Sequence, residues 1–279
     1  ILPLTRAFTH FLNFANIAEQ YHVVRRRRQS EFDDTAESPN PLVPLFEKFK
    51  QQEISADTLY QQICELKIEL VLTAHPTEVS RRTLIQKYDG INNALSKFDQ
   101  QKLTPRERQA VLADLKQLIS SAWQTDEIRQ HRPTPIDEAK WGFTTIEQTL
   151  WNAVPKFIRE LNGMVEQQCG QNLPLDIAPV RFASWMGGDR DGNPNVTHNV
   201  TQEVLWLSRW KAADLYLRDI ENLRWELSIQ QCSTEISEAL GLDHPEPYRE
   251  YLRDTRSRLK ATRHWLAEKL KGNDADDSL

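Results

Sequence analysis

The chain has 279 residues, with 35 Lys and Arg against 40 Asp and Glu, so its formal net charge is −5. Charged residues make up 27% and hydrophobic residues 39%, a balance that is typical of a folded globular protein and excludes a disordered or fibrous chain. The acidic balance also argues against a nucleic-acid partner, because such binding needs excess Lys and Arg to neutralise phosphates. No apolar run approaches the roughly 18 residues of a membrane-spanning helix, so no membrane association is expected.

The cysteines and the start of the chain give two further expectations. Cys64, Cys169 and Cys232 are odd in number, far apart and without metal-ligand spacing, which favours reduced thiols in a cytoplasmic protein over disulfides or a zinc site. The chain opens at Ile1, with neither an initiator Met nor the pattern of a signal peptide. We therefore expect that its start was imposed by truncation.

Glycine is scarce, at 9 of 279 residues, and Leu, Gln, Glu, Lys and Arg are abundant, so the chain is expected to be mostly α-helical. Residues 11–28 are predicted to form the first helix. A Ser-, Pro- and Asn-rich loop is expected over 30–44. The short apolar segment 68–73 is predicted to be a buried strand, and apolar residues at intervals of three and four predict a helix over 77–100.

The next two helices carry distinct local signals. Thr104 is followed by Pro105 and Glu107, which is the pattern of a capping box with proline at the first helical position. An apolar stripe then continues as far as Trp123. Residues 136–168 have a helical pattern with Pro155 inside it, so a kink or break is predicted at that proline.

The last third of the chain is predicted to hold one strand and two more helices. Residues 179–184 form a second short apolar segment followed by a polar turn, and they are expected to be a buried strand like 68–73. Helices are predicted over 201–227 and 247–270. Residues 273–279 are an acidic end that is expected to fray.

The first candidate site is the segment 71–82, VLTAHPTEVSRR, which follows the first predicted strand. His75 would lie in the turn between that strand and the next helix, where free backbone N–H groups and the helix dipole favour anions. A histidine at this position can also exchange protons near neutral pH. The alternative is that His75 satisfies a buried hydrogen bond and that Arg81 and Arg82 form a solvated helix face.

The second candidate site is the segment 184–197, SWMGGDRDGNPNVT, which follows the second predicted strand. Three of the nine glycines lie within positions 187–192, so this loop needs unusual backbone angles or a close approach. A calcium loop is excluded, because its sixth position is Pro194 and its twelfth is Val200. Two interpretations stay open: an anion-accepting turn with Arg190 as its charge and Trp185 as an apolar wall, or a structural turn.

Both segments resemble signatures of phosphoenolpyruvate carboxylase. Residues 71–82 are similar to the family's histidine signature and residues 184–197 to its glycine-rich loop, while residues 11–28 resemble its N-terminal region. The resemblance implies a mostly helical protein with long amphipathic helices and a few buried strands that would belong to an incomplete α/β (TIM-like) barrel. It also implies an N-terminal helical region over 1–64 and the first part of the barrel over 65–279.

The resemblance further implies a cytoplasmic, homotetrameric, Mg²⁺-dependent enzyme. It would join phosphoenolpyruvate and bicarbonate to give oxaloacetate and phosphate, by way of carboxyphosphate and the enolate of pyruvate. His75 matches the family's essential histidine, which would handle a proton or stabilise charge as carboxyphosphate breaks down. Trp185 matches a tryptophan that walls the substrate pocket. Arg190 and Arg81 are candidates for binding phosphate or bicarbonate by charge.

Several features of the family are not found in this sequence: the active-site lysine, the second catalytic histidine, the acidic metal ligands and the C-terminal effector site. The chain is therefore expected to be an N-terminal fragment that lacks the metal site and is inactive alone. The alternative is a non-catalytic helical scaffold or an effector-binding module that has kept the two motifs.

Overall fold

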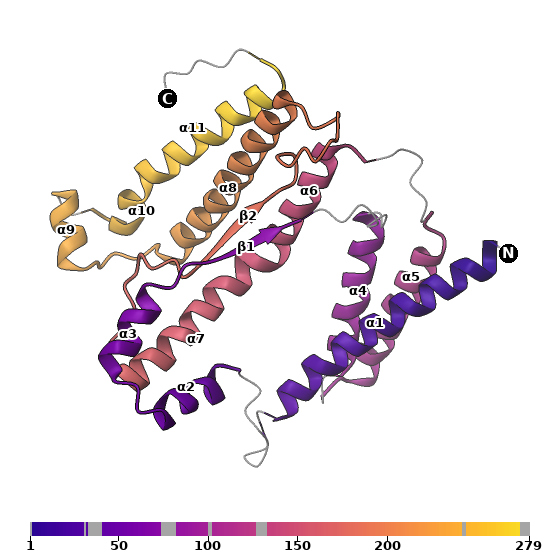
Figure 1. Cartoon of the computed structure of the whole chain (residues 1–279), viewed down its shortest axis with the longest axis horizontal. Helices are drawn as coiled ribbons and strands as arrows, with labels where there is room; N and C mark the ends of the chain where they lie inside the picture. Colours follow the sequence, from indigo (N-terminus) through magenta and orange to yellow (C-terminus); the bar gives the residue numbers. More distant parts are fainter. Residues whose placement is uncertain are drawn as a thin grey trace. The chain divides into compact units, whose positions relative to one another are not determined.

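The computed structural model describes residues 2–30, 32, 41–73, 82–99, 102–126, 133–241 and 244–273. The side chains of Leu2 and Arg82 are outside this description. In chain order the elements are α1 (Leu2–Ser30), α2 (Leu42–Gln51), α3 (Ala56–Cys64), β1 (Ile68–Leu72), α4 (Arg82–Phe98), α5 (Pro105–Trp123), α6 (Pro135–Thr145), the π-helix η1 (Ile146–Leu150), α7 (Trp151–Cys169), β2 (Val180–Ser184), α8 (His198–Glu226), α9 (Thr234–Leu240), α10 (Pro247–Tyr251) and α11 (Arg253–Leu270) (Figure 1). The expectation of a mostly helical chain with few strands is confirmed.

The chain forms two compact units whose segments alternate along the sequence. The first unit comprises Ile1–Glu65, His75–Arg132 and Glu160–Ile177, and the second comprises Leu66–Ala74, Pro133–Arg159 and Ala178–Leu279. The predicted division into a helical region over 1–64 and a barrel region over 65–279 stays a prediction.

The first unit contains two groups of packed helices. In one, α4 packs against both α1 and α5. In the other, α2, α3 and the second half of α7 bury an apolar cluster, with Phe46 2% and Val165 0% exposed. The remaining buried members of this cluster are Leu42, Leu59, Ile63, Leu161 and Leu173. Helices α2, α3 and α7 thus meet through their apolar faces, as expected for amphipathic helices.

The capping box at the start of α5 is present as predicted. The Thr104 hydroxyl accepts the Glu107 backbone N–H at 3.3 Å, and a Glu107 carboxylate oxygen accepts the Thr104 backbone N–H at 2.8 Å. The bonds from the backbone and the side chain of Thr104 hold the pKa of Glu107 below its usual value. Two backbone donors that no helix bond could satisfy are therefore paired.

Thr104→Ala should lower the free energy of unfolding by about 1 kcal/mol, because it removes the N-cap acceptor. Urea unfolding followed by circular dichroism measures this, and Thr104→Ser, which keeps the oxygen, should unfold like the parent. Because the folded pKa of Glu107 is depressed, the carboxylate's contribution is complete above the unfolded pKa and declines as the pH falls through the folded one. An equal loss for the alanine and serine variants would contradict the capping role.

The irregular segment near Pro155 lies earlier in the chain than predicted. The helix continues through Pro155, and η1 interrupts it at Ile146–Leu150. A proline ring collides with the carbonyl four residues earlier, which is here that of Trp151. Trp151 is the first residue of α7 and directly follows η1, so the wider π-turn ends where the proline ring crowds the helix backbone.

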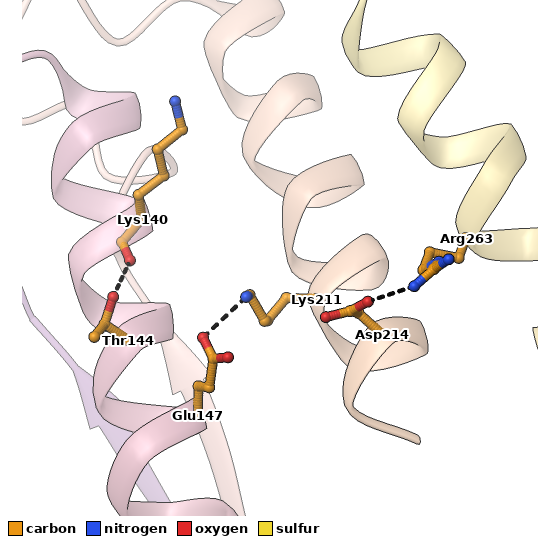
Figure 2. A network of polar contacts seen from close by, with 6 residues as sticks. All are labelled: Lys140, Thr144, Glu147, Lys211, Asp214 and Arg263. Atoms are coloured by element: carbon orange, nitrogen blue, oxygen red, sulfur yellow. Dashed lines mark hydrogen bonds and ion pairs between the residues drawn. The ribbon is translucent and has the colours of Figure 1, made fainter. Parts of the chain in front are cut away.

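Helix α8 is the central helix of the second unit and packs against α6 and α11. Charged pairs join it to η1 and to α11 (Figure 2). Lys211 contacts Glu147 of η1 at 2.9 Å, and Arg263 of α11 donates to Asp214 at 2.8 Å. These pairs are partly exposed, so each contributes at most about 1 kcal/mol, and mainly sets the register of the helices.

The two strands are present where the sequence predicts them, but no residue of either strand is buried. Ile68 and Leu70 are 47% and 49% exposed, and Val71 is 37% exposed. β1 and β2 form a parallel two-stranded sheet, and parallel strands are normally covered on both faces. Much of the apolar surface of β1 therefore stays in contact with water.

Candidate functional site

The two strands end at the same edge of the sheet. β1 pairs in parallel with β2 in a register that places Leu72 opposite Ser184. The pairing continues one residue further, because the Trp185 backbone N–H donates to the Leu72 carbonyl at 3.1 Å. Each motif therefore begins at the end of a strand, as predicted, and the structure shows that the two strands are neighbours.

A tight turn follows β2 directly. The Trp185 carbonyl accepts the backbone N–H groups of Gly188 and Asp189, both at 2.9 Å. Gly187 and Gly192 have φ values of +72° and +74°, in the left-handed region that glycine adopts readily. The high glycine content of this loop is thus explained at two positions by backbone conformation.

The turn is anchored on helices α6 and α8 of the same unit. The Met186 side chain is buried with Ala139, Phe143 and Val204. A Cβ atom at Gly187 would lie 2.5 Å from a methyl group of Val204, so the backbone approaches α8 more closely than any other residue would allow. The loop is therefore fixed immediately after Trp185.

The Trp185 side chain itself is 57% exposed, between its backbone bond to β1 and the buried Met186. A large apolar side chain held at a strand end but not covered is unusual, since aromatic residues normally bury most of their surface. It is available to form one wall of a larger pocket.

The structure assigns Arg190 a contact within its own loop. Its Nε–H donates to the Val196 carbonyl at 3.2 Å, and Val196 is 6% exposed. The guanidinium therefore bridges the two ends of the 190–196 loop. An arginine held in this way can still present its other N–H groups to an anion, so anion binding stays a prediction.

The other two predicted site residues, His75 and Arg81, lie outside the described residues, as does the predicted helix start at Thr77. Along the chain, His75 follows the last residue of β1, Leu72, by three positions.

Within the described ranges, no group of three or more His, Cys, Asp or Glu side chains is arranged to hold a metal ion. No helix within these ranges is long and apolar enough to cross a membrane.

Comparison with known proteins identifies the family of this chain. The family model described as phosphoenolpyruvate carboxylase matches residues 1–278. The chain belongs to the phosphoenolpyruvate carboxylase family. Among its relatives named phosphoenolpyruvate carboxylase, it is 81% identical to one from Acinetobacter baumannii and 78% identical to one from Acinetobacter baylyi, each over 278 residues. A relative of the same name from Marinobacter nauticus is 54% identical over 278 residues.

All three matches cover 100% of this chain but 31% of the relative. The chain thus spans about a third of the length of these phosphoenolpyruvate carboxylases and corresponds to an N-terminal portion.

Two residues that support the loop were not singled out from the sequence. Thr201, in the first turn of α8, donates its hydroxyl to the Gly187 carbonyl at 2.8 Å. Val204 lies one turn further along and contacts the position of the missing Cβ. The sequence indicated a close approach of this loop only through its concentration of glycine. That signal does not say which helix the loop backbone approaches.

Proposed function

We propose that the chain provides an acid–base histidine and one apolar wall for the carboxylation of phosphoenolpyruvate by bicarbonate, which gives oxaloacetate and phosphate. The observation that carries this proposal is the parallel pairing of β1 and β2, since both family motifs follow that one sheet edge. In α/β barrels, the loops at the C-terminal ends of the strands form the active site.

Trp185 is proposed to exclude water from the reacting carbon. When a bicarbonate oxygen attacks the phosphorus of phosphoenolpyruvate, the bridging P–O bond breaks and leaves the enolate of pyruvate. The enolate carbon then attacks carbon dioxide, released from carboxyphosphate together with phosphate. Protonation of that carbon would instead give pyruvate, so an exposed indole that can cover it favours the carboxylated product.

His75 is proposed to exchange a proton, or to stabilise charge, as carboxyphosphate breaks down. An imidazole can do both near neutral pH. Arg81 and the free N–H groups of Arg190 are proposed to bind phosphate or bicarbonate, for which guanidinium groups are suited by charge and by geometry.

Three further properties are proposed for the whole enzyme on the family resemblance: dependence on Mg²⁺, a homotetrameric state and a cytoplasmic location. The roles proposed for this chain's residues do not involve the metal. When bound elsewhere in the enzyme, Mg²⁺ would supply charge stabilisation to the phosphate and the enolate oxygen.

A chimera tests the proposal. Residues 1–278 of this chain would replace the matching segment of the Acinetobacter baumannii relative, from which the segment differs at about a fifth of its positions. We expect the chimera to release phosphate from phosphoenolpyruvate only with bicarbonate present and to form oxaloacetate, while the 279-residue chain alone forms none.

An inactive chimera that is folded would contradict the proposed function and support the alternative of a helical scaffold or an effector-binding module. Activity of the 279-residue chain alone would contradict the expectation that the segment is inactive without the rest of the enzyme. Phosphate release and oxaloacetate would be measured in parallel for both proteins.

A further inference from the structure

The position of Trp185 depends on what holds the next two residues. The Trp185 backbone is bound to β1, but its indole is 57% exposed and has little packing of its own. Met186 is 7% exposed, and Gly187 is buried between β2 and α8. Any shift of these two buried residues would be transmitted to Trp185 through a single turn of backbone.

Helix α8 contacts Gly187 at two points. The Thr201 hydroxyl donates to the Gly187 carbonyl at 2.8 Å. The Val204 side chain occupies the space beside the Gly187 Cα, so that an added Cβ would lie 2.5 Å and 3.0 Å from two of its carbon atoms. Val204 is itself 7% exposed and β-branched, so it has few alternative rotamers with which to give way.

We propose that Thr201 and Val204 of α8 are positioning residues for Trp185. They hold Gly187 against the first turns of the helix and so set where the indole stands at the sheet edge. This inference rests on the proposed function, because the consequence of a misplaced indole is protonation of the enolate. A loosened loop would admit water to the enolate. The enzyme would then convert phosphoenolpyruvate into pyruvate and phosphate, and bicarbonate would be regenerated from the released carbon dioxide and water.

Two glycines of the loop make a matched pair for the test. Gly187 and Gly192 have nearly the same φ, +72° and +74°, so a Cβ strains the backbone similarly at both. They differ in surroundings, because a Cβ at Gly192 would have no heavy atom within 4 Å. A difference between Gly187→Ala and Gly192→Ala therefore reports the contact with α8 and not the backbone conformation.

In the chimera, Gly187→Ala is expected to raise the ratio of pyruvate to oxaloacetate about tenfold, whereas Gly192→Ala should leave this ratio close to that of the parent. Adding Val204→Ala to Gly187→Ala makes room for the new methyl group and should return the ratio toward that of Gly192→Ala.

Thr201→Val, which loses the hydroxyl donor, should also raise the ratio of pyruvate to oxaloacetate, and Thr201→Ser should not. Product analysis at saturating phosphoenolpyruvate measures all five variants.

Hydrogen exchange at the Trp185 backbone N–H, followed by mass spectrometry, gives a readout that needs no activity. Faster exchange is expected in Gly187→Ala and Thr201→Val, and parent-like exchange in Gly192→Ala and Thr201→Ser. If the parent chimera makes no oxaloacetate, the proposed function fails, and the exchange data alone decide the positioning role. Equal exchange and equal product ratios in the Gly187 and Gly192 variants would overturn the inference.

Discussion

Replacing His75 with asparagine in the chimera should slow oxaloacetate formation by about a hundredfold or more. General acid–base catalysis by a placed side chain contributes roughly 10²–10⁴ in rate, and an amide cannot exchange a proton near neutral pH. Asparagine also carries no positive charge with which to stabilise the departing phosphate. The rate would be measured through NADH-linked reduction of oxaloacetate, over a range of phosphoenolpyruvate concentrations.

His22→Asn is the matched control, because His22 is exposed on α1 and is not part of the proposed site. It should have the kinetics of the parent chimera. The loss in the His75 variant is expected in kcat more than in KM, since the proposed role is in the breakdown of carboxyphosphate and not in binding phosphoenolpyruvate. Unchanged turnover in the His75 variant would remove this histidine from the mechanism.

Replacing Phe46 with alanine should destabilise the first unit by about 3–5 kcal/mol. Phe46 is 2% exposed in the cluster of α2, α3 and the second half of α7, and its ring meets that of Phe49 edge-on at 5.8 Å between centroids. Removing a buried aromatic ring loses its transfer free energy and leaves a cavity that the surrounding helices fill only in part. Such a loss is a large share of the stability of an ordinary domain.

Urea unfolding of the 279-residue chain measures the size of this loss, and hydrogen exchange with mass spectrometry locates it. Peptides from α2, α3 and residues 160–169 should lose protection, while those from α8 and α11 should change little. Phe8→Ala is the control, because Phe8 is 62% exposed on α1 and its removal should cost no more than about 0.5 kcal/mol. Equal losses for the two variants would show that the Phe46 cluster contributes little to the unit.

Signals confined to a few neighbouring residues predicted local structure well. The capping box at Thr104 depends on residues three positions apart, and it appears as predicted. The two strands were located by short apolar runs that end in polar turns, and both were placed within one or two residues. A kink or break was predicted at Pro155, but the helix continues through this proline, and the irregular turn lies earlier, at Ile146–Leu150.

Family membership was also predictable, because the two motifs are long. The match of residues 1–278 to the family model confirms it. The surroundings of the motifs were less accessible. Apolar composition predicted buried strands, yet Ile68 and Leu70 are about half exposed. Composition indicates that a side chain needs cover, but it cannot say whether the covering elements are present.

The sequence by itself determined the helical class, the capping box at Thr104, the two strands and the glycine-rich turn, since each depends on neighbouring residues. Only the tertiary structure decided that β1 pairs with β2, more than a hundred residues away, and that Gly187 lies against α8. It also decided that the Nε–H of Arg190 is bonded to its own loop. These features depend on which elements pack together, and the burial and close approach that result are properties of the assembled chain and not of any short segment.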